Sequence, residues 1–196
     1  MASGTEKLAA RPKGEMTLEE VLDHHAREIC ALYQQDDIPW VLGYSGGKDS
    51  TAVVQLVWNA ISSLPSSERH KPIYVISTDT LVENPVVSTW VRKSLNRMTE
   101  AARESGLPFI AKELNPALQD TFWVNLIGKG YPAPRPKFRW CTERLKIKPV
   151  DHFVRTVVER NGEAIIVLGT RKAESTVRAA RLNKLEGSTG RELLSA

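Results

Sequence analysis

Apolar residues along this chain form short continuous runs separated by longer stretches of mixed polarity. The runs predict buried β-strands, because a strand that is covered on both faces needs no polar alternation. These strands are expected at residues 39–44, 73–77, 109–111 and 164–168. The stretches between them predict helices, at 18–35, 49–62, 85–104, 117–127 and 142–159. Two of these helices have recognisable starts, a capping box at Thr17–Glu20 and the pair Asn84-Pro85.

Strands that alternate with helices are typical of an α/β fold with a parallel sheet and helices on both faces. In such sheets, ligands bind at the carboxyl ends of the strands. Polar clusters follow three of the predicted strands, at residues 45–50, 78–80 and 169–171. We therefore expect these clusters to meet at one edge of the sheet.

The length of 196 residues, with 41% hydrophobic and 26% charged residues, indicates one globular domain. We expect a flexible arm at 1–15, the folded domain at 16–185, and a flexible or truncated tail at 186–196. No apolar run approaches the roughly 20 residues of a membrane helix, and the start has no signal-like apolar core. The expectation is a cytoplasmic protein with no membrane partner. The net charge of +4 is compatible with a nucleotide or nucleic-acid partner.

The segment Ser45-Gly46-Gly47-Lys48-Asp49-Ser50 joins a predicted strand to a predicted helix. Glycines let several backbone amides point at one anion, and a helix start adds unpaired N–H groups and the positive end of its dipole. The common nucleotide loop G-x-x-x-x-G-K-[ST] does not fit, because Lys48 is followed by Asp49. We predict a phosphate-binding loop in which Asp49 either ligates Mg²⁺ or only caps the helix.

Asp79 and Gly169 stand at the ends of other predicted strands. A carboxylate at Asp79 either holds a ribose hydroxyl, a base amine or a metal-bound water, or forms a turn. Arg171 and Arg178, which follow Gly169, either bind phosphate oxygens or belong to a solvated basic helix.

A second unusual segment, residues 138–149, contains Cys141, two aromatic residues and several cations. A thiol among cations suits sulfur chemistry or metal ligation, and the alternative is a buried thiol beneath a basic surface helix. Arg139, Arg144 and Lys146 are candidate ligands for an anionic acceptor. The proline-rich residues 128–136 are predicted to form a flap above them.

Residues 45–50 and 141–149 resemble the PP-loop and the C-x-x-R-K-x-x-P segment of the phosphoadenylylsulfate-reductase-like PP-loop ATP pyrophosphatases, the second with one residue inserted between the basic pair. A late G-x-R-x-x-E-S element is similar at residues 169–175, and the resemblance covers about residues 38–182. It implies an adenine-nucleotide alpha-hydrolase-like fold that cleaves ATP between its α and β phosphates with Mg²⁺. The implied catalytic residues are Lys48, Asp49 and Arg171. The implied ATP-binding residues are Ser45, Gly46, Gly47, Lys48, Asp49, Ser50, Asp79, Gly169 and Arg171.

Within this branch the chain is most similar to the DndC family, the ATP pyrophosphatases of DNA phosphorothioation, through residues 43–51, 78–85 and 139–142. The similarity implies that ATP activates a DNA backbone phosphate for sulfur insertion, and that the acceptor is bound by Arg139, Arg144 and Arg178. The implied partners are DNA, a cysteine desulfurase and other phosphorothioation proteins. Members of this family are expected to bind a [4Fe–4S] cluster, which needs four thiolates. This chain has only Cys30 and Cys141, so Cys141 is a cluster ligand only in a longer parent.

Three alternatives remain open at this point. A phosphoadenylylsulfate or adenylylsulfate reductase would use the same fold without splitting ATP, although the second redox cysteine is missing. A tRNA-thiolating adenylyltransferase would cleave ATP in response to tRNA. A non-catalytic nucleotide-binding module would bind ATP without turnover.

Overall fold

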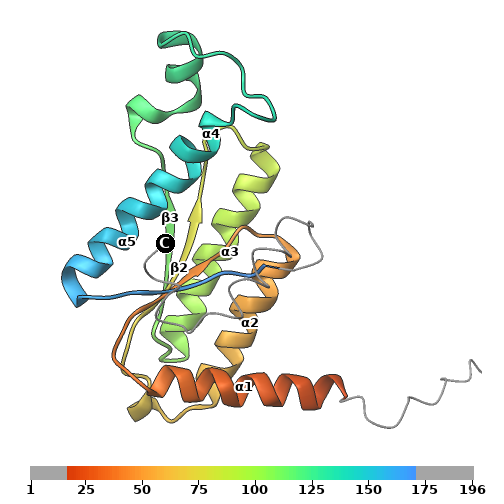
Figure 1. Cartoon of the computed structure of the whole chain (residues 1–196). Coiled ribbons are helices and arrows are strands. Elements are labelled where there is room, and N and C mark those ends of the chain that lie inside the picture. Colours follow the sequence, from red (N-terminus) through yellow and green to blue (C-terminus); the bar gives the residue numbers. More distant parts are fainter. Residues whose placement is uncertain (1–16, 171–196) are drawn as a thin grey trace, which may run out of the picture.

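The computed structural model describes residues 17–170. They form a single four-stranded parallel sheet with helices on both faces (Figure 1). The strands are β1 (Trp40–Gly43), β2 (Ile73–Thr78), β3 (Phe109–Leu114) and β4 (Ile165–Val167). The helices are α1 (Leu18–Gln34), α2 (Lys48–Ser63), α3 (Pro85–Glu104), α4 (Trp140–Thr142) and α5 (Lys148–Asn161). Four short helical turns complete the described elements: η1 (Ser66–Glu68), η2 (Leu118–Asp120), η3 (Val124–Gly128) and η4 (Glu143–Ile147). The fold class predicted from the sequence is confirmed.

The strand order in the sheet is β3-β2-β1-β4. Trp40 pairs with Ile73 on one side of β1 and with Ile165 on the other. The chain therefore builds outward from β1 to β3 and then crosses to the opposite edge to form β4. In open α/β sheets such a reversal leaves a crevice at the carboxyl ends of the two strands where the order reverses, here β1 and β4, and ligands bind in it.

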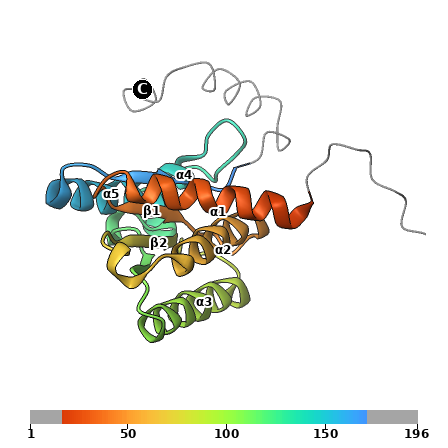
Figure 2. The same cartoon turned by 90° about the horizontal axis from the view of Figure 1, so that it is seen from below.

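The core lies mainly between the sheet and the pair α2 and α3, whereas α5 covers the opposite face (Figure 2). Alternate residues of β2 face the two layers, because successive side chains of a strand point in opposite directions. Val75 belongs to the core on the α2–α3 side, while the ring of Tyr74 contacts Phe153 of α5 edge-on, with centroids 5.3 Å apart. The sheet is thus covered on both faces.

A buried lysine stabilises the opposite, amino-terminal edge of the sheet. Lys71 is only 2% exposed, and its Nζ lies 2.6 Å from Oδ1 of Asp36 and over the rings of Tyr33 and Trp40. Burial raises the pKa of Asp36, but hydrogen bonds from Lys71 and Ile38 and the nearby positive charges lower it more, so the pKa lies below its usual value. This ion pair joins the end of α1 to the start of β2.

The predicted elements are present, with two differences at the ends of helices. Residues 117–127, predicted as one helix, form the separate turns η2 and η3, because Thr121 between them has an extended backbone with ψ of 155°. The helix predicted from residue 142 starts at Trp140 and passes through the wide turn η4 before α5. The capping box of Thr17 and Glu20 and the N-cap of Asn84 are both formed. The predicted domain limits stay predictions, and the helix or turn predicted near Lys172 lies outside the described residues.

Candidate functional site

The segment with the most distinctive sequence connects β1 to α2 as a tight loop. Gly46 has a φ of +72°, and a Cβ at this position would lie 2.5 Å from the ring of Trp90 in α3. Both the left-handed backbone and the close packing therefore require glycine. The first N–H groups of an α-helix have no acceptor within the helix itself. Gly47 is the N-cap of α2 and provides no side-chain cap for them.

Two serine hydroxyls hold this loop in shape. Oγ of Ser50 donates to the carbonyl of Gly47 at 3.0 Å and accepts from the amide of Ser45 at 3.2 Å. The hydroxyls of Ser45 and Ser50 are also 3.1 Å apart. Ser50 is buried and holds the loop in shape, whereas Ser45 is exposed and is the more accessible of the two to a ligand.

A cavity of about 540 Å³ opens beside the loop at the carboxyl edge of the sheet. Its size falls within the range of about 300–1,000 Å³ that is usual for small-molecule sites. The lining residues are Val41, Gly43, Tyr44, Ser45, Ser50, Ile76, Ser77, Thr78, Asp79, Glu83, Val87, Ser88, Val91, Glu113, Lys146, Val150, Ile166, Leu168, Gly169 and Thr170. All three polar clusters predicted at strand ends contribute to this wall, and the members that line it are Ser45, Ser50, Thr78, Asp79, Gly169 and Thr170.

Gly169 brings the end of β4 into contact with the start of α2. A Cβ on Gly169 would lie 2.9 Å from the carbonyl oxygen of Asp49 and 3.2 Å from the amide nitrogen of Ser50. No other residue type fits this gap without displacing backbone. The predicted residues Gly46, Gly47, Lys48 and Asp49 lie in the loop next to the cavity rather than in its wall; Lys48 is exposed and Asp49 is half-buried.

The predicted carboxylate Asp79 lies in the cavity wall and also shapes the turn after β2. Its Oδ1 accepts a hydrogen bond from the amide of Leu81 at 2.9 Å, and Leu81 has a φ of +61°. Its Oδ2 lies 3.5 Å from Arg92, whose Nε donates to Glu113 at 3.1 Å. One carboxylate oxygen of Asp79 is thus used by the backbone turn, and the other is oriented by a cation.

Sequence reasoning missed three charged residues at this site. Glu83 and Glu113 line the cavity, and Arg92 contacts both Asp79 and Glu113. Glu113 lies in β3 opposite Ser77 of β2, so the strand-end rule applied to β3 would have found it. Glu83 pairs with Lys146 of η4 at 3.4 Å, and both residues line the cavity. This pair links two segments that are 63 positions apart, a proximity for which the sequence gives no signal.

Arg144, a predicted acceptor ligand, anchors the segment that was predicted to be a flap. It donates to Asp120 at 2.7 Å and to the hydroxyl of Tyr131 at 2.8 Å. Burial raises the pKa of Asp120, but hydrogen bonds from Lys148 and Arg144 and the charges of both cations lower it more, leaving it below its usual value. Arg139 is exposed at the start of α4. The acceptor role of both arginines stays a prediction, and Arg171 and Arg178 lie outside the described residues.

The cysteines do not fit a [4Fe–4S] cluster held by this chain alone, because such a cluster needs four thiolates. Cys30 lies in α1 and donates to the carbonyl of Ala60 at 3.2 Å, whereas Cys141 lies in α4. Within residues 17–170, no group of three or more His, Cys, Asp or Glu residues is arranged to hold a metal ion. A Mg²⁺ ion that is held by phosphates and one carboxylate, as predicted for Asp49, needs no such group.

Known proteins resemble this chain in sequence and in structure. No family model matches it. The uncharacterized protein MJ0066 of Methanocaldococcus jannaschii is 26% identical over 167 residues, which cover 83% of this chain and 30% of the relative. The chain therefore spans less than a third of the length of the curated relative that it matches. No helix within the described part of the chain combines the length and apolar character needed to cross a membrane.

Two solved structures show similarity over most of the chain. One is the U34-tRNA thiolase NcsA from Methanococcus maripaludis with its [4Fe–4S] cluster, at 14% identity and a TM-score of 0.48, covering 97% of this chain and 62% of that one. The other is the phosphoadenylyl-sulfate reductase from Candida auris in complex with phosphate, at 16% identity and a TM-score of 0.44, covering 82% and 71%.

Proposed function

We propose that this chain binds ATP at the crevice between β1 and β4 and cleaves it between the α and β phosphates, as the activating step of a sulfur transfer. One observation carries the proposal. The loop Ser45-Gly46-Gly47-Lys48-Asp49-Ser50 joins a buried strand to a 16-residue helix at the point where the strand order reverses, beside a cavity of about 540 Å³. A glycine loop, an uncapped helix start and a lysine together suit a chain of phosphates.

Each part of the site has a role in this reaction. The amides at the start of α2 and the ammonium of Lys48 hold the β and γ phosphates and neutralise the charge that develops on the departing pyrophosphate. Asp49 would hold Mg²⁺ together with the phosphates, and the ion would supply further charge neutralisation. The apolar residues Val41 and Ile76 provide a surface for adenine, and Asp79 accepts from the ribose. Arg171, outside the described residues, keeps the role that the sequence resemblance implies.

The acceptor in this proposal is a phosphate of the DNA backbone, activated for sulfur insertion with a cysteine desulfurase as sulfur source. Support comes from the sequence resemblance at residues 43–51, 78–85 and 139–142 and from the cations of residues 129–148 beyond the sheet edge. The alternatives are a sulfonucleotide reductase and a tRNA-thiolating enzyme. They predict thioredoxin-dependent sulfite release and tRNA-stimulated ATP cleavage, respectively.

The experiment that tests the proposal is incubation with Mg²⁺ and ATP labelled separately at the α and γ phosphates. The incubation is done with DNA, with tRNA and with neither. We expect the α label in AMP or an adenylated acceptor and the γ label in pyrophosphate. Replacing Lys48 with Ala should abolish pyrophosphate release without unfolding the chain. Lys93→Ala, which removes an exposed lysine from α3, is the matched control and should retain full activity. Release of ADP and orthophosphate, or equal activity of both variants, would contradict the assignment.

A further inference from the structure

Positive charge is concentrated in one part of the chain, residues 115–150. This segment contains seven Lys or Arg residues and two acidic ones, a net charge of +5, whereas the whole chain has +4. The remaining residues together are therefore slightly negative. The segment runs from the end of β3 through η2, η3, α4 and η4 into the first turn of α5, and it projects beyond the carboxyl edge of the sheet (Figure 1).

A tight turn at residues 135–138, together with Arg139 directly after it, displays three of these cations. The amide of Arg135 donates to the carbonyl of Phe138 at 3.1 Å, and the amide of Phe138 donates back to Arg135 at 2.8 Å. Pro136 occupies the second position of this turn, where its fixed φ is favourable. Arg135, Lys137 and Arg139 are all exposed, and none forms an ion pair with any residue between 17 and 170. Three cations without acidic partners on one short turn form a surface suited to a polyanion.

The turn is held in place by an aromatic cluster below it. Trp140 stacks on Phe122 with centroids 5.4 Å apart, contacts the ring of Tyr131 at 5.5 Å, and donates from Nε1 to the carbonyl of Pro132 at 3.0 Å. Arg144 then fixes the hydroxyl of Tyr131. A surface that is rigid before binding loses less entropy when a partner binds. Phe138, next to the buried Trp140 cluster in sequence, keeps 38% of its surface exposed.

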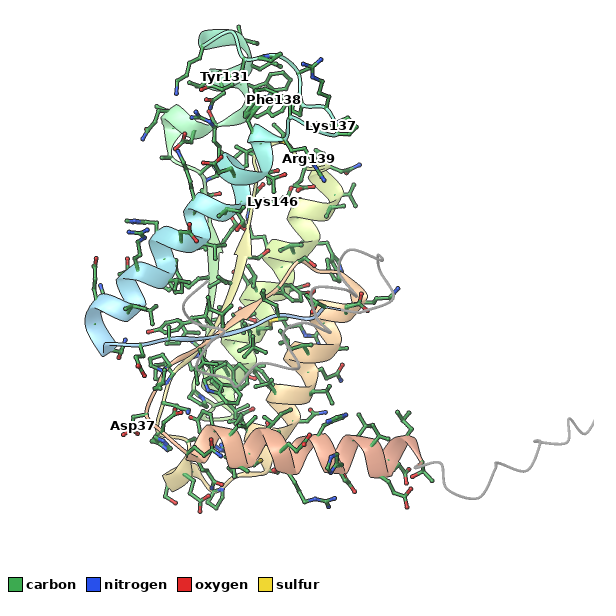
Figure 3. The ribbon with its side chains drawn as sticks, viewed as in Figure 1. Asp37, Tyr131, Lys137, Phe138, Arg139 and Lys146 are labelled. Atoms are coloured by element: carbon green, nitrogen blue, oxygen red, sulfur yellow. The ribbon has the colours of Figure 1, made fainter. Side chains whose placement is uncertain are left out.

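Figure 3 shows Lys137, Phe138 and Arg139 at the projecting end of the molecule, with Lys146 between them and the sheet and Asp37 at the opposite end. Lys146 also lines the cavity beside the glycine loop. Lys146, which pairs with Glu83, is thus the cation seen between the turn and the candidate ATP site.

We propose that residues 135–139 form a binding site for an unpaired nucleic-acid strand, in which Arg135, Lys137 and Arg139 contact phosphates and a base stacks on Phe138. The inference rests on the proposed function only in that this strand carries the acceptor phosphate. An exposed aromatic ring between cations favours an unpaired strand, because only an unstacked base presents its face to a side chain. A base-paired duplex hides that face and offers only its phosphates. DNA and RNA share the recognised chemistry.

The test is fluorescence anisotropy without ATP, using a labelled 12-nucleotide DNA strand, the same sequence as RNA, and the DNA duplex. We expect a single strand, DNA or RNA, to bind more tightly than the duplex. Phe138→Leu, which keeps apolar bulk and removes the ring, should weaken single-strand binding about fivefold or more, as expected for loss of one stacked base. Lys137→Gln should reduce the slope of log affinity against log salt by about 0.7. Arg97→Gln, an exposed cation of α3, is the matched control and should change neither quantity.

Three results would overturn the inference: equal weakening by Arg97→Gln, tighter binding of the duplex, or unchanged binding by Phe138→Leu. Binding of polyglutamate as tight as that of the single strand would also overturn it, since the ring would then have no role. Circular dichroism of each variant confirms that the fold is retained. Because ATP is absent from this assay, a chain that fails to cleave ATP can still bind the strand, and the two proposals fail separately.

Discussion

Gly169 offers a sharp test of whether the end of β4 and the glycine loop form one site. Replacing it with alanine places a Cβ 2.9 Å from the carbonyl oxygen of Asp49, whereas ordinary contact begins at 3.4 Å. The obstructing atoms belong to the backbone at the start of α2 and cannot rotate away. The end of β4 must therefore move from the loop by about half an ångström, a strain that typically costs about 1–3 kcal/mol.

Two further glycines provide a graded comparison. A Cβ at Gly43 would meet the side-chain Cδ2 of Leu168 at 2.7 Å, and a side-chain end can move, so Gly43→Ala should cost less. At Gly128 the nearest atom is Cγ1 of Val124 at 4.0 Å, so Gly128→Ala should leave the stability unchanged or slightly raised. The expected order of destabilisation is Gly169→Ala, then Gly43→Ala, then Gly128→Ala.

The assays are thermal unfolding for stability and calorimetric titration with ATP and Mg²⁺ for affinity. Gly169→Ala should lower the melting temperature by about 2–4 °C for each kcal/mol lost. It should also weaken ATP binding about fivefold or more, because the phosphates bind at the junction that has moved. If Gly169→Ala matches the unchanged protein in both stability and ATP affinity, the close contact between β4 and α2 does not exist. If only stability falls, ATP binds elsewhere.

Three other perturbations test separate contacts. Lys71→Ala should destabilise the fold by about 3 kcal/mol, because it leaves Asp36 without its buried partner. Urea unfolding measures the loss of stability, and a loss under about 0.5 kcal/mol would refute the buried pair. Asp120→Asn tests pH dependence. The folded pKa of Asp120 lies below its unfolded value of about 3.9, so its contribution is present above about pH 4 and is lost as the pH falls through the folded pKa. Unfolding curves at pH 7 and pH 3 should therefore show a smaller acid-induced loss in the variant than in the unchanged protein. Glu83→Gln should tighten ATP binding two- to fivefold at low salt, because it removes a negative charge and frees Lys146; weaker binding would show that Glu83 itself contacts the ligand.

Local patterns in the sequence predicted most of the fold. Trp40, Val41 and Leu42 form a continuous apolar run and lie in a strand buried on both faces, as the run predicts. The glycine loop was placed correctly between a strand and a helix because a short continuous apolar run precedes it and a longer stretch of mixed polarity follows it. The turn between η2 and η3 was missed, because it depends on the backbone of Thr121, a residue type with no strong turn preference.

Long-range pairings were beyond sequence reasoning. Nothing near Lys71 in the sequence shows that it is buried, because its partner Asp36 lies 35 residues earlier, at the end of α1. Likewise, Arg144 was predicted to be available to an acceptor, and only the fold brings it to Asp120, 24 residues away. A charged side chain reads as a surface residue unless the partner that compensates its burial is known.

The position of β4 also affects how the protein is made. β1 pairs with β2 after a connection of about 30 residues. The other edge of β1 stays unpaired until β4 is made, roughly 120 residues later. At ribosomal speeds of about 5–20 residues per second, that edge stays open for on the order of ten seconds while β2 and β3 can already form. An open strand edge can pair with strands of other chains, so the nascent chain is most prone to aggregate during this interval. Gly169 lies two residues after the end of β4, so the wall of the proposed ATP crevice is completed only when the last described strand has left the ribosome. ATP capture by nascent chains of increasing length would therefore report the moment at which the sheet is finished.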